Sequence, residues 1–357
     1  MQRNCIAMHS TFIDGANEEC GPSRHKGHLG GSHMYHAFKT AVLASVVAAA
    51  VTTGAHAQVK YPDKPVSIIV TFSPGGTTDS TARVFAEELT KRNGQQFLVE
   101  NLPGANGSVG TAKASTAKAD GYRLVVGSPN TLIQNPYLYG DTGYTLESFT
   151  PVARLAVMDF IVVTRPALGI KTLQDLVKYS KDNPGKLNFG SAGIGNTAHQ
   201  AGELFKLRTG ADITHIPYQG GALATAALLA GEVDVLFNTA TEVLPYIKSG
   251  DAVALAVMSP ERIPFLPDVP TLTEAGVKDA NVAAWNGLFA PAGTPSDVVG
   301  FLNAEVSEIL KDEKVQKRLF DLGLRPTNPS AAALAKELEA EKPAMIELVD
   351  LTGGPQK

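Results

Sequence analysis

The chain of 357 residues carries 31 Lys and Arg against 35 Asp and Glu, a net charge of −4, and it lacks the basic patches interleaved with aromatic residues that are typical of nucleic-acid binding. Both of its cysteines and six of its 8 histidines precede residue 58. The rest of the chain therefore offers no disulfide framework, no thiol chemistry and no histidine-based zinc site, so we expect neither a metal nor a cofactor.

The N-terminal segment has the features of an export signal. Lys39 precedes a short apolar run at 41–51, and residues 55–57 (AHA) form an A-x-A cleavage site. We expect cleavage after Ala57, so that residues 1–57 are an N-terminal extension plus signal peptide outside the folded protein. A membrane anchor is the alternative, but the run falls short of the roughly 20 apolar residues that a spanning helix needs. Both Met1 and Met34 stay open as the start of translation.

Strands and helices alternate through the rest of the chain. Strands are predicted at 66–72, 96–100, 123–127, 187–190, 213–216, 233–237 and 252–257, with extended segments at 150–156, 160–164 and 285–289. Helices are predicted at 78–92, 172–181, 196–208, 222–230, 242–248, 296–310, 313–322 and 330–349, and one more ends near residue 119.

This alternation is typical of mostly parallel sheets covered by helices. The chain contains two such units, with extended crossovers predicted near 160–164 and 254–259. An inserted second unit with two crossovers produces a ligand cleft between two lobes. A single doubly wound domain of the same length is the alternative.

The first strand leads into the most informative turn of the chain. The segment 66–83 (VSIIVTFSPGGTTDSTAR) ends a strand, turns through two glycines and enters a helix with Thr77 and Asp79 in its first turn. Such a turn leaves backbone N–H groups unpaired in front of the positive end of the helix dipole, which attracts anions without any arginine. An ordinary turn that needs glycine only for its backbone geometry is the alternative. Asp79 is either a helix-start residue or a group that faces an ammonium on the ligand.

The same pattern recurs at other strand ends. The strand at 187–190 is followed by SAGIGNT (191–197), and the strand at 213–216 by PYQGG (217–221). The strands at 123–127 and 233–237 end in SPNT (128–131) and NT (238–239). Because ligands bind beyond the carboxyl ends of strands in open α/β sheets, loops from both lobes are expected to hold the two ends of one anion.

Other chemistries have weaker support in the sequence. Gly104, Gly107 and Gly110 are spaced by three, so no dinucleotide fingerprint is formed, and no P-loop motif occurs. Ser191 does not lie in a G-x-S-x-G motif, because position 189 is Phe. An exported hydrolase that uses Ser191 and His199 is the alternative function.

An ordered set of motifs resembles the Bug family, the solute-binding receptors of tripartite tricarboxylate transporters. The set covers the chain after residue 57 almost end to end. It comprises YPDKP (61–65), the segment 72–83, ENLPGA (100–105), ADGY (119–122), GSAG (190–193), YQGG (218–221), GEVD (231–234), LPDVPT (266–271) and WNGLFAPAGTP (285–295).

The resemblance implies a two-lobed α/β periplasmic-binding-protein fold of the Venus flytrap, type II-like class. Lobe 1 would comprise 58–163 and 258–357, and lobe 2 would comprise 164–257. It implies a periplasmic receptor, not an enzyme, that closes on a small carboxylate and delivers it to membrane transporter subunits. We expect a monomer that binds no nucleic acid. A di- or tricarboxylate, an acidic amino acid and an aromatic acid all stay open as ligands.

The family holds its carboxylate with backbone N–H groups and small hydroxyl side chains. Members often carry a further small residue where Thr77 and Thr78 stand, so the shape of this pocket is expected to be particular to this protein. Carried onto this chain, the implied ligand-binding residues are Ser73, Gly75, Gly76, Thr77, Asp79, Ser128, Asn130, Ser191, Gly193, Asn196, Thr197, His199, Tyr218, Gly220, Gly221 and Asn238.

Overall fold

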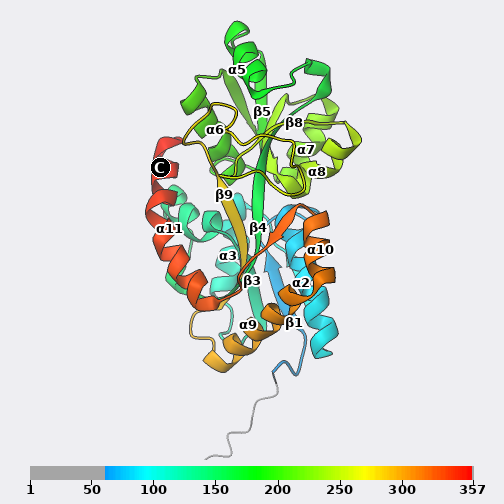
Figure 1. Cartoon of the computed structure of the whole chain (residues 1–357). Helices are drawn as coiled ribbons and strands as arrows, with labels where there is room; N and C mark the ends of the chain where they lie inside the picture. Colours follow the sequence, from blue (N-terminus) through cyan, green and yellow to red (C-terminus); the bar gives the residue numbers. More distant parts are fainter. Residues whose placement is uncertain (1–60, 356–357) are drawn as a thin grey trace, which may run out of the picture. The chain divides into compact units, whose positions relative to one another are not determined.

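The computed structural model describes residues 61–355, so the predicted signal peptide and its cleavage site lie outside the described residues. Helices cover a mixed sheet whose strand order is β2-β1-β3-β9-β4-β7-β5-β6. Figure 1 shows two lobes, one with α2, α3, α9 and α10 and the other with α5, α6, α7 and α8, with β4 and β9 running between them. The alternation predicted from the sequence thus produces two α/β lobes.

The first lobe is built on three parallel strands. Strand β1 (Val66–Val70) pairs in parallel with β2 (Phe97–Asn101) on one side and with β3 (Arg123–Gly127) on the other. Strand β9 (Ala283–Pro291) then pairs antiparallel with β3, and β10 (Leu324–Pro326) pairs antiparallel with β4.

A single long strand, β4 (Phe149–Thr164), belongs to both lobes. Its residues from Phe149 to Asp159 pair with β9, and those from Phe160 to Thr164 pair with β7. The two extended segments predicted around residues 150 and 160 are therefore one strand. Its apolar, β-branched end is buried on both faces, as expected for a strand in the middle of a covered sheet.

The second lobe repeats the parallel arrangement around β5 (Leu187–Ser191). This strand pairs in parallel with β6 (Ile213–Pro217) and β7 (Val235–Thr239), whereas β7 and β8 (Val253–Val257) run antiparallel to β4. The expectation of mostly parallel sheets is therefore wrong for every pair that involves β4 or β9. These strands carry the chain between lobes, and their direction opposes that of the strands beside them.

The helices agree with the predicted ranges to within a few residues, except that the helix expected to end near residue 119 ends at Ser115. The sequence analysis did not predict η2, α4 or β10. Pro136 lies in the first turn of α4, where a helix tolerates proline. The helices are α2 (Thr77–Asn93), α3 (Ser108–Ser115), α4 (Asn135–Tyr139), α5 (Leu173–Asp182), α6 (Thr197–Thr209), α7 (Gly221–Ala230), α8 (Ala240–Ser249), α9 (Ser296–Lys311), α10 (Glu313–Asp321) and α11 (Ala331–Leu351), with short turns η1 (Ala105–Gly107), η2 (Asn130–Gln134), η3 (Leu146–Ser148) and η4 (Pro166–Leu168).

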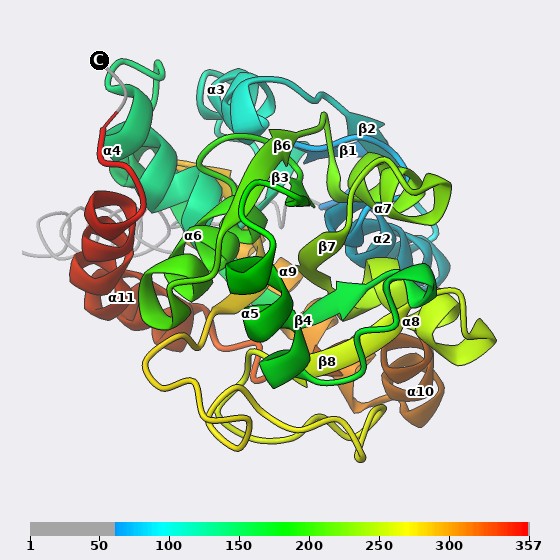
Figure 2. The same cartoon turned by 90° about the horizontal axis from the view of Figure 1, so that it is seen from above.

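The helix starts follow local capping rules. Thr172 and Asp175 form a reciprocal capping box at the start of α5, and Asn196 caps α6 by accepting the Ala198 N–H. In the view from above in Figure 2, α11 lies beside α6, with which it is in contact. Throughout residues 61–355, every helix is too short or too polar to span a lipid bilayer.

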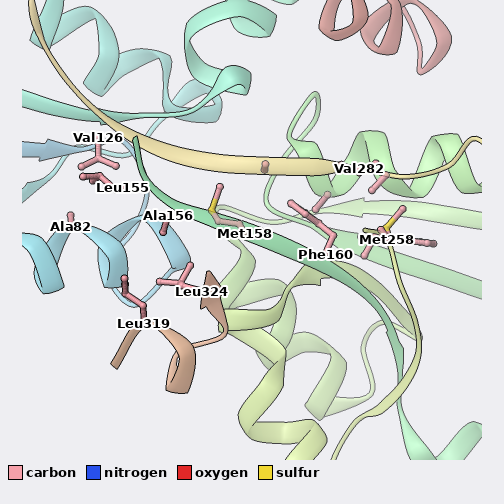
Figure 3. Close-up of a cluster of buried hydrophobic side chains, with 14 of the residues drawn as sticks. Ala82, Val126, Leu155, Ala156, Met158, Phe160, Met258, Val282, Leu319 and Leu324 are labelled. Atoms are coloured by element: carbon pink, nitrogen blue, oxygen red, sulfur yellow. The ribbon is translucent and has the colours of Figure 1, made fainter. Parts of the chain in front are cut away.

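The main hydrophobic core follows β4 from one lobe toward the other. In Figure 3, Leu155 and Ala156 lie among side chains of the first lobe, and the row continues through Met158 and Phe160. Both Met158 and Phe160 also line the cavity described next. The further residues of this core labelled in Figure 3 are Ala82, Val126, Met258, Val282, Leu319 and Leu324.

Candidate ligand-binding site

A cavity of about 460 Å³ lies at the carboxyl ends of strands from both lobes. Its wall is formed by the segments that follow β1, β3, β5, β6 and β7, together with residues of β4, α6 and α11. This is the place at which open α/β sheets bind ligands, because parallel strands end together and leave a crevice beyond their carboxyl ends.

Ten of the implied site residues line this cavity, and six do not. Those outside its lining are Gly75, Asp79, Ser191, Gly193, His199 and Tyr218. Those that line it are Ser73, Gly76, Thr77, Ser128, Asn130, Asn196, Thr197, Gly220, Gly221 and Asn238.

Asp79 holds the loop that precedes α2 in place through its carboxylate. Its carboxylate accepts hydrogen bonds from the Gly75 N–H at 3.0 Å, from Arg83 Nε at 2.8 Å and from Asn101 Nδ2 at 3.0 Å. Burial alone would raise the pKa of Asp79, but the hydrogen bonds from Arg83, Gly75 and Asn101 hold it below its usual value. With these partners, Asp79 fixes the turn that precedes α2, in line with the helix-start interpretation.

The proposed Ser191 and His199 pair does not form. Ser191 is buried, and its hydroxyl lies 2.6 Å from Nε2 of His215, whereas Nδ1 of His199 accepts the Gly195 N–H. Burial, reinforced by the neighbouring His199, lowers the pKa of His215 to about 3, so this imidazole is neutral at physiological pH. Because Ser191 does not line the cavity, the arrangement gives a substrate there no access to this hydroxyl.

Glu242 is a cavity residue that the sequence analysis missed. It lies in the first turn of α8, is half-buried, and its Oε1 accepts the Thr77 N–H at 3.3 Å. A Cβ placed on Gly221 would lie 1.9 Å from Oε2 of Glu242, and one on Gly76 would lie 3.3 Å from Oε1. Burial raises the pKa of this carboxyl, and the Thr77 N–H opposes the rise only in part. The two glycines thus leave room for a carboxyl group that the chain itself supplies.

Gln200 is another cavity residue that the sequence analysis missed. It follows Asn196 by one helical turn, and Asn196, Gln200, Leu204 and Arg208 recur at every fourth position along α6 and line the cavity together. This four-residue spacing was visible in the sequence, but only the position of α6 shows which face of the helix meets the cavity.

Hydrogen bonds join the two lobes beside the cavity. Thr77 Oγ1 of the first lobe lies 2.5 Å from Thr239 Oγ1 of the second. Further bonds between the lobes run from Ser73 Oγ to the Gln219 carbonyl (3.1 Å), from Asn130 Nδ2 to the Gly195 carbonyl (2.8 Å) and from Tyr139 Oη to the Ile194 carbonyl (2.7 Å).

The lining combines hydrogen-bond donors with apolar side chains such as Met158, Phe160 and Leu204. Hydroxyl and amide side chains and the starts of α2 and α7 supply donors from both lobes. Across residues 61–355, no group of three or more His, Cys, Asp or Glu side chains is arranged to hold a metal ion.

Comparison with known proteins identifies the family. A family model described as the tripartite tricarboxylate transporter family receptor matches residues 81–350. A UPF0065 protein of Bordetella pertussis is 33% identical over 297 residues, which cover 83% of this chain and 92% of that protein.

Solved structures agree in fold. That of R. palustris Rpa4515 with adipate is 31% identical, has a TM-score of 0.80, and the match covers 83% of this chain and 100% of that chain. That of the periplasmic binding protein BugD is 33% identical, has a TM-score of 0.79, and the match also covers 83% and 100%. The predicted two-lobed binding-protein fold is thereby confirmed, and the chain belongs to the tripartite tricarboxylate transporter receptors, the Bug family.

Proposed function

We propose that this protein captures a small carboxylate between its two lobes and delivers it to a membrane transporter. The observation that supports this most directly is that strand-end segments of both lobes, rich in uncharged donors, surround one cavity. A relative of the same fold was solved with adipate, which is a small dicarboxylate. We propose the same ligand class, small carboxylates, for this protein.

The proposed grip uses one helix start from each lobe. Helix α2 begins at Thr77 directly after Gly76, and α7 begins at Gly221 directly after Gly220. Each start presents N–H groups at the positive end of a helix dipole. These interactions strengthen when closure excludes water, because the local dielectric falls. The carboxylate would bind one lobe first, and rotation of the other lobe would then cover it.

Lobe 1 would comprise 58–163 and 258–357, and lobe 2 would comprise 164–257. After removal of 1–57, the protein would act in the periplasm as a monomer, bind its ligand without chemical change and pass it to transporter subunits. The proposed ligand contacts are the ten cavity-lining residues named above, with Asp79 and Gly75 holding the first loop in place.

A ligand screen tests the proposal. The chain from Gln58 to Lys357 is screened by thermal shift against mono-, di- and tricarboxylates, amino acids and aromatic acids, and native mass spectrometry checks for a ligand retained during purification. A ligand present at about 100 times its Kd stabilises the folded state by roughly 2.7 kcal/mol. A shift of several degrees with one class of acid is expected. If no acid shifts the midpoint and no ligand is retained, the proposal is wrong.

A matched pair of glycine variants then locates the site. Gly76 has a φ of −79°, so a side chain there meets no backbone strain, and its Cβ would point at Glu242. Gly76→Leu should abolish binding of the acid found in the screen and leave the fold intact. Gly300 lies on α9, where an added Cβ would have nothing within 4 Å, so Gly300→Leu serves as the control. Wild-type affinity in Gly76→Leu would remove the first loop from the site.

A further inference from the structure

Gln200 is a buried amide without a partner on the wall of the cavity. Its side chain is fully buried, at 0% exposure, and neither Nε2 nor Oε1 has a hydrogen-bond partner among the residues that the structure describes. A buried polar group left unpaired carries its full desolvation penalty. An amide that retains both a free donor and a free acceptor at a cavity wall is therefore suited to a molecule that supplies the complementary pair.

Asn130, from the other lobe, adds a second unpaired acceptor to the same wall. Its Nδ2 donates to the Gly195 carbonyl at 2.8 Å and to Gln134 Oε1 at 3.0 Å, and Gln134 Nε2 donates in turn to the Met345 carbonyl. Two backbone carbonyls thus fix the orientation of both amides. Oδ1 of Asn130 is left as an acceptor with no partner within residues 61–355. A ligand that supplies a donor can therefore pair with this acceptor.

The charged side chains of the cavity wall are mainly acidic. Among the described residues that line the cavity, three are acidic, namely Glu242, Asp279 and Glu347, and one is basic, Arg208. Arg208 Nε donates to the backbone carbonyl of Asp279. Asp279, Glu347 and Arg208 are exposed, so water screens their charges, whereas Glu242 is half-buried. The acidic excess therefore gives only a small disadvantage to a ligand with several carboxylates.

We propose that the ligand is a small acid that carries a hydroxyl or ammonium donor besides its carboxylate, and that Gln200, with Asn130, selects that donor. This inference rests on the proposed function. The unpaired amide atoms have almost no exposed surface, so the wall must shift slightly for Oε1 of Gln200 and Oδ1 of Asn130 to accept from the ligand and for Nε2 of Gln200 to donate to one of its oxygens. An unsubstituted acid of the same length leaves these acceptors unpaired and binds more weakly for that reason.

The test compares acids that differ only in the donor. Propionate, lactate and alanine, then succinate, malate and aspartate, then glutarate, 2-hydroxyglutarate and glutamate are titrated into the wild type by calorimetry. Tricarballylate and its hydroxy derivative citrate serve as the tricarboxylates. We expect a hydroxy or amino acid of one chain length to bind about tenfold or more tightly than its unsubstituted parent, as loss of a buried hydrogen bond implies. Preference for the hydroxy or for the amino acid tells the two donors apart.

The variant Gln200→Leu should reduce that preference to within about threefold, because leucine fills similar space and offers neither donor nor acceptor. Its thermal midpoint without ligand should equal or exceed that of the wild type. Gln200→Met is the second variant if leucine impairs folding. Glu203→Gln, on the same helix but paired with Lys206, is the control and should keep the preference.

Three results bear on the inference separately from the receptor function. Equal affinity for an acid and its hydroxy and amino derivatives overturns the inference and leaves the receptor function standing. Tightest binding by an unsubstituted acid, tricarballylate included, does the same, as does a donor preference that survives in Gln200→Leu. If no acid in this set or in the wider screen binds at all, the proposed function fails and the inference fails with it.

Discussion

The backbone N–H of Thr77 in the first lobe donates to Oε1 of Glu242 in the second, at 3.3 Å. Thr77 begins α2, so this N–H is one of those that the helix leaves unpaired. The group expected to hold a ligand carboxylate thus already contacts a carboxyl of the chain itself. Glu242 is therefore both a link between the lobes and a competitor for the anion-binding end of α2.

Replacing Glu242 by glutamine should stabilise the protein at neutral pH. Burial raises the pKa of Glu242 above its usual 4.5. The proton that this carboxyl holds favours the folded state fully below pH 4.5, and the benefit is lost as the pH rises through the raised pKa. Above it, the folded state carries an ionised carboxyl in a half-buried site. Glu242→Gln removes that charge, and we expect a gain of about 1 kcal/mol at pH 8, a few degrees in Tm.

The pH dependence of this difference is the decisive measurement. The Tm of Glu242→Gln minus that of the wild type should be positive at pH 8 and shrink toward zero at pH 4.5. Comparing two proteins at each pH cancels groups such as His215, which both contain. Glu203→Gln controls for the loss of one negative charge on a helix. A difference that is negative at pH 8 and constant with pH would mean that Glu242 stays ionised and favourable in the folded state.

A methyl group on Gly221 should displace Glu242. A Cβ at this position would lie 1.9 Å from Oε2 and 2.6 Å from Cδ of that carboxyl, far inside van der Waals contact. Such overpacking costs typically about 1–3 kcal/mol. We expect Gly221→Ala to lose stability of this order by urea unfolding, and to lose well under 1 kcal/mol in a Glu242→Ala background. Equal losses in the two backgrounds would show that the strain arises elsewhere.

Asp79→Asn should loosen the first loop. An asparagine has one acceptor oxygen where the carboxylate receives Gly75 N–H, Arg83 Nε and Asn101 Nδ2. Because the pKa of Asp79 is lowered in the folded protein, its ionised carboxylate stabilises the fold at pH values above 3.8, its usual pKa. This benefit is lost as the pH falls through the lowered pKa. We expect a loss of about 1–3 kcal/mol at pH 7 in urea unfolding, persisting to pH 4.

The control for this variant is Asp182→Asn, which breaks an exposed salt bridge with Lys178. Exposed pairs contribute little, so its stability should change by less than about 0.5 kcal/mol. Similar losses in Asp79→Asn and Asp182→Asn would remove the special role assigned to Asp79.

The local signals in the sequence were sufficient for the strand-end loops. Glycine turns and capping residues act within a few positions, so the starts of α2, α6 and α7 were predicted to within one residue. The full length of β4 was not predicted, because Asp159 interrupts the apolar pattern of this strand. In the fold, Asp159 is 3% exposed and accepts two hydrogen bonds from Arg325, at 2.7 and 2.8 Å. The partner comes from β10, 166 residues later, and no short-range pattern reveals it.

Long-range placement also explains why the sequence analysis missed Glu242 and Gln200. Glu242 and Gln200 sit on helices whose cavity-facing sides depend on how those helices pack. For Gln200, the spacing of four from Asn196 was a usable signal once Asn196 was assigned to the site. Glu242 had no such signal, because its carboxyl meets Thr77 only through the contact between the lobes. The resemblance to the family covered the loops and left these two positions unassigned.

The last prediction concerns the contact between lobes. Tyr139 Oη on α4 donates to the Ile194 carbonyl, in the second lobe, at 2.7 Å. Tyr139→Phe removes the hydroxyl that makes this bond and keeps the aromatic ring. The net value of one such bond is about 1 kcal/mol, which would favour separated lobes about fivefold relative to the wild type. We expect a larger radius of gyration without ligand by small-angle scattering, and ligand binding weakened by a similar factor.

The same helix supplies a matched control. Tyr137 Oη donates to Asp350 on α11, at 2.8 Å, a bond that does not reach the second lobe. Tyr137→Phe therefore removes the same chemical group from the same helix, and it should leave the radius of gyration and the affinity unchanged. If both variants behave alike, loss of a tyrosine hydroxyl from α4 acts through the stability of the first lobe. If Tyr139→Phe alone expands the protein, the Tyr139 bond holds the lobes together.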